Sequence, residues 1–340
     1  MKRIRLGLLA VGVAALGGLL ARGAAVEAQP APPEGAGRIL SIATLAPAGS
    51  TWMRVLNAWN RELRLRTNNG LSLRIYPGGV QGDETEVIRK IRQGRLDGGS
   101  VTAVGLSQVH RPALTFQMPG MFRNYQALDA ARVATASDIN SAFDTAGFAF
   151  MGWADVGVSR VYSRVPVTVP NDLRGVHPYL WRDDRVMPAF YQEVGVSPVV
   201  LQLPEVLSAL QTNRIDSFIT TPSAANALQW SQRVTHMTDV NIAVVVGATI
   251  IRKSQVDALP ADQQTILRET ATQFHQLLIS NLRRDEARTL TTQQTRGITH
   301  VAVTDAQRAQ WTSLFDRTRA RLGSTIAEPA FIARVRGAAR

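Results

Sequence analysis

The side chains that could do chemistry in this chain are mainly arginines, aromatic residues and carboxylates. The sequence has no cysteine, and its five histidines are isolated from one another, without the spacing of metal ligands. The HExxH, GxSxG and GxGxxG patterns are absent, so no metalloprotease, hydrolase or dinucleotide signature is present. The sequence predicts a protein that is not an enzyme and needs no metal ion or cofactor, with a catalytic group assembled from distant residues as the alternative.

One dense group of such side chains lies in the stretch DLRGVHPYLWRDD. Tyr179 and Trp181 are two residues apart, so on a strand they share one face, and Asp183 and Asp184 follow at its end. An aromatic pair beside carboxylates favours an amine through cation–π contact and charge. The formal net charge of +12 and the adjacent Arg182 favour an organic anion instead. We expect the anion, and the amine stays open.

A glycine-rich segment, PGGVQGDETEVIRKIRQGRLDGGSV, raises the question of a phosphate site. Phosphate loops use the backbone N–H groups and the positive dipole at the N-terminus of a helix. Here the helix starts with Asp83, Glu84 and Glu86, and carboxylates in a first turn cap the helix and repel a phosphate. We therefore expect a compact turn at the ligand-facing edge of a sheet.

The first 28 residues have the order of a secretory signal peptide. MKRIR is basic, an apolar run follows from Leu6 to Ala21, and AAVEAQP supplies small residues for cleavage after Ala28. The run is shorter than the roughly 20 residues of a membrane-spanning helix. We expect a periplasmic protein with a flexible lead-in over 29–37. We expect no nucleic-acid binding, because arginines outside the leader alternate with acidic residues.

Two segments of the chain repeat each other. EVIRKIRQGRLD, from Glu86 to Asp97, aligns without a gap with EVLSALQTNRID, from Glu205 to Asp216. Each has a helix pattern that ends at a residue suited to the left-handed conformation, Gly94 in one and Asn213 in the other. Each also lies between two strand-like segments, which indicates parallel strands joined through a helix. The repeat predicts two similar α/β lobes.

Beyond Ile251 the pattern becomes helical. A long polar-faced helix is expected to start at 259–262, in the sequence LPAD, and to pack across the lobes. GITHVAVT predicts one more strand and DAQRAQWTSLFDRTRARL another helix, so 298–325 is expected to pack on the lobes. We expect 326–340 to be a poorly structured tail.

Taken in order, these motifs resemble the periplasmic solute receptors of TRAP transporters, the DctP-type family. The resemblance runs from TLAPAGSTW through the glycine-rich loop, and continues in MPGMFRNYQALD, PVTVPNDLRG, EVLSALQTNRIDS and ALPADQQTILRETA. It implies an α/β two-lobe periplasmic binding protein, type II-like, with a mixed sheet flanked by helices in each lobe and long C-terminal helices across them. It also implies a role in transport across the membrane. The receptor would deliver a small-molecule solute to a transporter made of a small four-helix membrane subunit and a large permease.

The resemblance also implies where the solute binds. In the family, an arginine after the D-L-[KR]-G motif pairs with the carboxylate of the solute, and that position falls on Tyr179, which argues against a simple monocarboxylate. A second family arginine falls on Val158. Arg160 shares its strand face and is the expected replacement, with a surface salt bridge as the alternative. The family's polar residue before a proline falls on Thr220 and Thr221.

The expected ligand-binding residues combine this resemblance with the local chemistry. They are Ser50, Trp52, Ser100, Trp153, Arg160, Tyr179, Trp181, Arg182, Asp184, Thr220, Thr221 and Asn226. For Ser50 the alternative is a plain helix cap, and for Trp153 it is a place in the core.

The expected lobes are discontinuous in sequence. The first comprises 38–157 and 248–297, and the second 158–247. Hinge strands near 154–161 and 244–251 would let the lobes close on a solute. Dimerisation through the C-terminal helices, coupling to a signalling protein and an apolar solute stay open.

Overall fold

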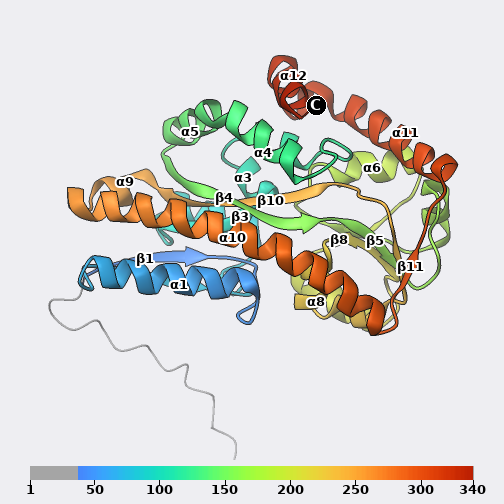
Figure 1. The fold of residues 1–340 in the computed structure, drawn as a ribbon, viewed down its shortest axis with the longest axis horizontal. Coiled ribbons are helices and arrows are strands. Elements are labelled where there is room, and N and C mark those ends of the chain that lie inside the picture. The colour runs from blue at the N-terminus through green and yellow to red at the C-terminus, as the bar shows by residue number, and fades with distance from the viewer. Residues whose placement is uncertain (1–36, 340) are drawn as a thin grey trace, which may run out of the picture. The chain divides into compact units, whose positions relative to one another are not determined.

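The computed structural model describes residues 37–339, so the expected signal peptide and most of the lead-in lie outside the described residues. In this part of the chain two lobes are built on separate sheets, and a long helix passes along both (Figure 1). Among residues 37–339, none of the helices combines the length and the hydrophobicity that a membrane crossing requires.

The first lobe contains a sheet in which five described strands have the order β2-β1-β3-β10-β4. They are β1 (Arg38–Ala43), β2 (Leu71–Tyr76), β3 (Gly98–Thr102), β4 (Phe148–Val158) and β10 (Val244–Arg252). β1 pairs parallel with β2 and with β3, whereas β10 is antiparallel to β3 and β4. The expected parallel strands joined by helices are therefore present, with β1 between the other two.

The helices of the first lobe flank this sheet. They are α1 (Thr51–Arg66), α2 (Glu84–Arg92), α3 (Ala103–Ser107), the 3₁₀ helix η1 (Arg111–Gln117), α4 (Tyr125–Ala134), α5 (Ala136–Thr145) and α9 (Lys253–Asp257). α1 begins as predicted, because the Ser50 hydroxyl accepts a hydrogen bond from the Met53 N–H at 3.3 Å and so satisfies one free donor of the first turn. Its apolar stripe includes Trp59 and Leu63, which are fully buried.

The second lobe contains two groups of strands. β5 (Arg160–Ser163), β8 (Ser217–Thr220), β9 (His236–Thr238) and β11 (Thr299–Val301) form a sheet in the order β11-β9-β5-β8, and β6 (Tyr179–Trp181) pairs with β7 (Val199–Leu201). A parallel bridge between Pro178 and Ser217 joins β6 to β8. The order β7-β6-β8 thus repeats the order β2-β1-β3 of the first lobe.

The internal repeat is confirmed at the helix ends. Gly94 and Asn213 have φ values of 74° and 60°, the left-handed conformation that the sequence predicted after each helix. The predicted parallel strands are present in both lobes, because β6 pairs parallel with β7 and bridges to β8, and the strands are arranged in mixed sheets as expected. β8 makes its main ladder with β5, which is antiparallel.

The helices of the second lobe are short. They are η2 (Pro170–Gly175), α6 (Met187–Val194), η3 (Leu203–Glu205), α7 (Val206–Gln211), α8 (Pro222–Ala227) and η4 (Trp230–Arg233). The second repeat segment comprises the last residue of η3, all of α7 and the turn before β8, whereas the first forms most of α2 and the turn before β3.

The C-terminal region is helical, and it contacts both lobes (Figure 1). α10 (Ala261–Thr295) starts within the predicted LPAD segment, packs on α1 and β4, and reaches α8. α11 (Asp305–Leu322) packs on α6, and η5 (Gly323–Thr325) leads into α12 (Pro329–Ala338).

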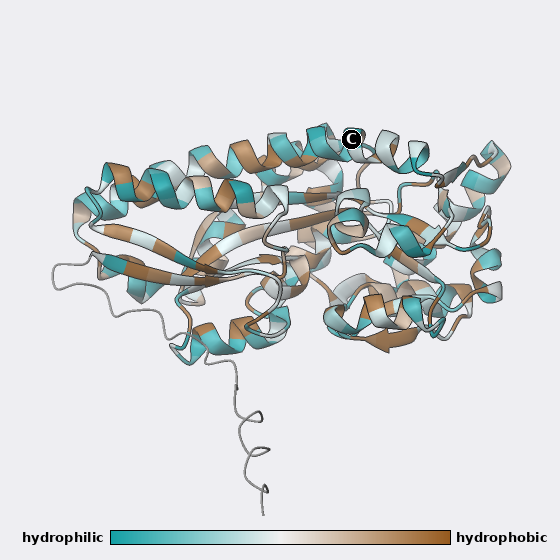
Figure 2. Ribbon diagram, turned by 90° about the horizontal axis from the view of Figure 1, so that it is seen from below, coloured by the Kyte–Doolittle hydropathy of each residue, from teal (hydrophilic) through white to brown (hydrophobic). Residues whose placement is uncertain are grey.

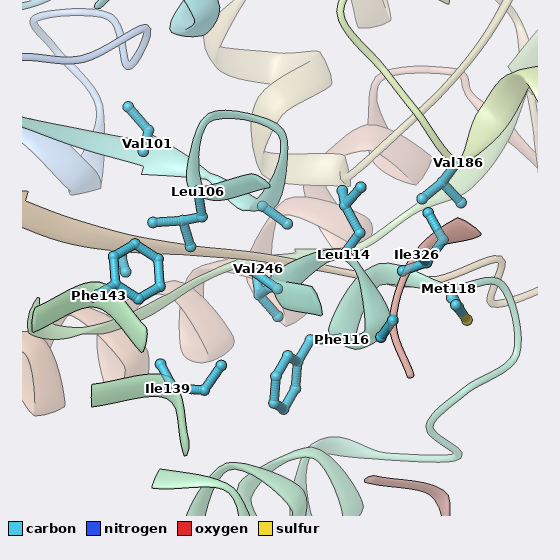
Figure 3. Packing of buried hydrophobic residues seen from close by; sticks show 14 of the residues in the cluster. Val101, Leu106, Leu114, Phe116, Met118, Ile139, Phe143, Val186, Val246 and Ile326 are labelled. Carbon is cyan, nitrogen blue, oxygen red and sulfur yellow. The ribbon is translucent and has the colours of Figure 1, made fainter. Parts of the chain in front are cut away.

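The prediction of a poorly structured tail is wrong. α12 packs on α4 and η1, and Phe331 and Val335 are buried in the core of the first lobe. Ile326, which precedes the helix, belongs to the same core (Figure 3). Phe331 and Val335 are four residues apart, so they lie on one face of the helix. The helix forms because that apolar face finds a surface to pack against, which the short pattern alone did not indicate.

Hydrophobic residues gather on the strands, whereas the surrounding helices carry both hydrophobic and hydrophilic residues (Figure 2). Between α4, β4 and α10 lies a buried polar cluster. Asp155, which is fully buried, accepts hydrogen bonds from Arg132 at 2.6 Å and from Arg283 at 2.7 Å. Glu286 accepts from the Tyr125 hydroxyl and from the Val158 N–H. These contacts fasten α10 to the end of β4, where the chain leaves the first lobe.

Candidate solute-binding cavity

A cavity of about 650 Å³ lies between the lobes in the described part of the chain. Its walls come from the loop before α1, from α1, α2, β3 and η1 of the first lobe, from β6, α6, β8 and α8 of the second, and from one face of α10. A volume of this size is typical of pockets that bury drug-sized ligands. Five aromatic side chains contribute to the walls: Trp52, Tyr179, Trp181, Tyr191 and Trp230.

One hydrogen bond joins the two lobes at this cavity. The indole N–H of Trp181, on β6, donates to the Asp83 carboxylate at 2.8 Å. Asp83 is the N-cap of α2 and also accepts from the Glu84 N–H at 2.9 Å. Burial raises the pKa of Asp83 above its usual value, and the hydrogen bond from Trp181 opposes this shift. The glycine-rich loop therefore leads to a carboxylate that contacts the other lobe.

Trp52 is held in place by a chain of hydrogen bonds. Its indole N–H donates to the Ser100 hydroxyl at 3.0 Å, and Ser100 and Thr249 are hydrogen-bonded at 3.0 Å. Thr249 in turn lies 2.8 Å from His275 Nε2, while His275 Nδ1 contacts the Ala271 carbonyl at 2.7 Å. Burial lowers the pKa of His275 to about 4, so the imidazole is neutral, donating to the carbonyl and accepting from Thr249. The chain fixes the Trp52 ring as a rigid wall.

Two carboxylates of the cavity wall are occupied by backbone groups. Glu84 accepts from the N–H groups of Thr102 and Gly105, both at 2.7 Å, and burial raises its pKa to about 7. Asp184 accepts from the Val186 and Met187 N–H groups at the start of α6, and burial raises its pKa as well.

Three residues of the cavity lining also carry a polar atom that is buried without a hydrogen-bond partner in the described residues: Gln117 Oε1, the Tyr179 hydroxyl and Ser223 Oγ. Tyr179 is only 6% exposed and packs edge-on against Trp230, with ring centroids 5.6 Å apart. Burial and nearby carboxylates raise the pKa of Tyr179 well above its usual value, so its hydroxyl is neutral. A buried polar group without a partner costs free energy, so these atoms would gain from a hydrogen bond to an uncharged polar group of a solute that reaches them.

The positive charge of the cavity is on a different wall. Among the described lining residues, the cations are Arg54 of α1 and Arg288 of α10. Arg54 lies 3.7 Å from Asp285, which is three residues before Arg288 on the same helix, and no ion pair joins Arg288 to another described residue. Both arginines are exposed, so they are placed to meet an anion at the solvent side of the cavity.

The structure brings many of the expected ligand-binding residues to this cavity. Those that line it are Ser50, Trp52, Ser100, Tyr179, Trp181, Asp184, Thr220 and Asn226. The Ser50 hydroxyl caps α1, and the Ser100 hydroxyl accepts a hydrogen bond from Trp52. Both hydroxyls therefore already have a hydrogen-bond partner, whereas that of Tyr179 has none. Their contacts with a solute remain predictions.

The other expected residues lie outside the lining. Arg160 forms an ion pair with Asp239 at 2.8 Å, which is the alternative that the sequence left open. Arg182 is half exposed and lies 3.7 Å from Glu205. Thr221 is fully buried and caps α8.

Trp153 also lies outside the lining, and it packs in the core of the first lobe, which was the alternative to a place in the cavity wall. Its ring packs against Phe116 and Phe150, with centroids 5.0 Å away in each case. The Arg132 guanidinium lies over its face at 5.0 Å. Trp153 thus supports the buried polar cluster near the end of β4.

Sequence reasoning missed several groups that line the cavity, above all Gln117, Trp230, Arg54 and Arg288. Leu282, Asp285, Thr289 and Thr292 of α10 also line it. Their spacing of three and four residues indicates one helix face, but a helical period alone does not say which face meets a cavity.

Comparison with known proteins shows the family of this chain. Residues 42–322 match the model of the bacterial extracellular solute-binding proteins, family 7, the DctP family. The chain belongs to this family. It is 24% identical over 266 residues to the C4-dicarboxylate-binding periplasmic protein DctP of Rhodobacter capsulatus, which spans 76% of this chain and 79% of that protein.

Solved structures of family 7 receptors share the two-lobe fold. A TRAP periplasmic solute-binding protein of Shewanella oneidensis with bound succinate superposes with a TM-score of 0.84 at 15% identity, over 90% of this chain and 100% of the other. A Bordetella pertussis extracytoplasmic solute receptor that binds pyroglutamic acid gives 0.82 at 17%, over 89% and 100%. The expectations of the family, of the α/β two-lobe fold and of a transport receptor are confirmed.

Proposed function

We propose that this family 7 receptor is exported to the periplasm after cleavage of its leader, binds a small organic acid between its lobes, and delivers it to the membrane subunits of a TRAP-type transporter. The observation that carries the proposal is the cavity of about 650 Å³, which has walls from both lobes and from α10. A solute that contacts both lobes stabilises the closed conformation, because it interacts with both walls only when they are close.

An acid is favoured because unpaired positive charge faces the cavity at Arg288 and because relatives of this chain bind succinate and pyroglutamic acid. A guanidinium recognises a carboxylate through two parallel hydrogen bonds. Position 179 on β6 holds a tyrosine and not an arginine, so we expect the carboxylate of the solute to bind at another wall of the cavity.

An amine solute is the second candidate, since Glu84 and Asp184 both line the cavity. Their oxygens already accept backbone hydrogen bonds, and burial raises both pKa values, which weakens the negative charge available to an ammonium group.

A thermal-melt screen of the ligand-stripped receptor tests the proposal. The panel holds organic acids, sugar acids, amino acids and polyamines. A solute at about 100 times its dissociation constant adds roughly 2.7 kcal/mol of stability, which raises the midpoint by several degrees. We expect the largest shifts among the acids. Shifts confined to amines, or none at all, would contradict it.

A further inference from the structure

The distribution of charge and polarity over the cavity walls narrows the class of solute. Resting on the proposed function, we infer that the solute is an organic monocarboxylate with an aromatic or otherwise apolar body. Its carboxylate would bind at Arg288, with Arg54 beside it, and an uncharged polar group would meet the Tyr179 hydroxyl.

The wall formed by β6 and α6 offers a solute no positive charge among its described residues. Tyr179 lines the cavity and has a neutral, buried hydroxyl without a partner, and Asp184 and Glu84 line the cavity as well. No described cation of the lining lies on β6 or α6. A buried carboxylate of the solute would meet no opposite charge there, and an unpaired buried charge is costly. This wall therefore accepts an uncharged hydroxyl, carbonyl or amide.

The wall formed by α1 and α10 carries the positive charge of the cavity, at Arg54 and Arg288. Arg288 follows Asp285 by three residues, so the two lie on one face of α10, and both line the cavity. Asp285 has partners in α1, because it accepts a hydrogen bond from Thr51 and lies 3.7 Å from Arg54. Arg288 has no ion-pair partner among the described residues. It is the guanidinium left for one carboxylate of a solute.

Aromatic side chains also line the cavity, in addition to the residues of these two walls. Trp52, Trp230 and Tyr191 are at most 6% exposed and line the cavity, together with aliphatic residues such as Leu203 and Ile219. Aromatic walls of this kind bury large apolar area and stack on ring systems. A second carboxylate, or a hydroxyl of a sugar acid, would be left unpaired where it faces these rings.

The test is a calorimetric comparison of probes on the full mature receptor. The aromatic acids are 4-hydroxyphenylacetate and phenylacetate, and the comparison ligands are succinate, galacturonate, 4-hydroxyphenylacetamide and tyramine. We expect 4-hydroxyphenylacetate to bind at least about tenfold more tightly than succinate, galacturonate and the neutral amide, the scale of one hydrogen bond to a charged group.

Two variants locate the contacts. Arg288→Gln should weaken 4-hydroxyphenylacetate about tenfold or more, whereas Arg284→Gln, one turn earlier on α10, should change it less than about twofold. In Tyr179→Phe, the preference for 4-hydroxyphenylacetate over phenylacetate should disappear, while phenylacetate itself binds as before. Circular dichroism melts confirm that each variant is folded.

The outcomes separate the two proposals. Tighter binding of succinate or galacturonate, with an affinity that does not depend on Arg288, overturns the inference and leaves the receptor for organic acids standing. Binding of 4-hydroxyphenylacetate that is equal in wild type and Arg288→Gln also overturns it. If no acid binds and tyramine does, both the inference and the proposed organic-acid function fail.

Discussion

The indole N–H of Trp181 in the second lobe donates to the carboxylate of Asp83 in the first, at 2.8 Å. Asp83 caps α2, directly after the glycine-rich loop. The glycine-rich loop thus leads to a carboxylate, which repels a phosphate at the start of a helix. It delivers a helix-capping carboxylate to the contact between the lobes, and this contact lies at the edge of the cavity, which Trp181 lines.

Removing this hydrogen bond should weaken solute binding. Trp181→Phe keeps an aromatic ring in the wall but removes one hydrogen-bond donor from Asp83, and with it the contact between the lobes. Loss of a hydrogen bond to a charged group costs about 1.5–3 kcal/mol, so the dissociation constant should rise about tenfold or more. Titration calorimetry with the best ligand of the melt screen measures it.

Trp311→Phe is the matched control for that experiment. Trp311 donates to the Thr168 carbonyl at 2.9 Å inside the second lobe and does not line the cavity. The Trp311→Phe variant should have a lower melting temperature but nearly the same affinity for the solute as wild type. Equal affinities in wild type and Trp181→Phe would show that the contact does not contribute to closure.

Glu84 should make the receptor less stable as the pH rises from about 4.5 to 7. Its pKa is about 7 in the folded protein against a usual 4.5. In this interval the unfolded chain is ionised and the folded one is still protonated, so the unfolded state binds fewer protons and is favoured as the pH rises. The loss is on the order of 3 kcal/mol.

Denaturant unfolding of wild type and Glu84→Gln at several pH values tests this slope. The difference in unfolding free energy between the two proteins should change with pH over that interval, because glutamine does not titrate. Other buried acids titrate in both proteins and their contributions cancel, except that of Asp83, whose charge acts on Glu84. Parallel pH profiles would contradict the assignment to Glu84.

Asp155 should be essential for stability near the end of β4. It is fully buried and pairs with Arg132 at 2.6 Å and Arg283 at 2.7 Å. Asp155→Asn leaves two guanidinium groups without this charge, and removing one partner of a buried pair costs about 3–5 kcal/mol. The control is Asp138→Asn, which breaks an exposed pair with Arg334 at 3.1 Å and should cost less than about 1 kcal/mol. Similar losses in chemical denaturation would refute the buried network's role.

The C-terminal helix α12 should stabilise the first lobe. Phe331 is 8% exposed and packs in its core, so Phe331→Ala should cost about 3 kcal/mol through lost burial and the cavity that remains. Arg336→Ala, on the exposed side of the same helix, should change the unfolding free energy by less than about 0.5 kcal/mol. A neutral Phe331→Ala would mean that α12 does not hold to the lobe.

Local patterns predicted the elements of this fold well. Ser50 caps α1, the long helix starts within the LPAD segment, and Gly94 and Asn213 both take the left-handed conformation that the repeat required. These features depend on residues near one another in sequence. α12 was missed because a short apolar stripe forms a helix only when a distant surface covers it.

The site was harder to predict because its charges depend on distant pairing. Arg160 looked available, yet Asp239 in another loop neutralises it, whereas Arg288 looked like one more solvated residue of a polar helix. Tyr179 was found through the resemblance to the family. Its role depends on burial and on the missing partner of its hydroxyl, which only the packed structure shows.

The most direct test of the central claim is calorimetric titration of the best organic acid from the melt screen into receptors whose cavity is open or filled. Ala224 lines the cavity, so Ala224→Trp would occupy it, and Ala130→Trp, on the exposed face of α4, is the control. We predict one-to-one binding to wild type and Ala130→Trp, and no measurable binding to Ala224→Trp. Unchanged binding to Ala224→Trp, in a folded protein, would contradict the claim that the solute binds between the lobes.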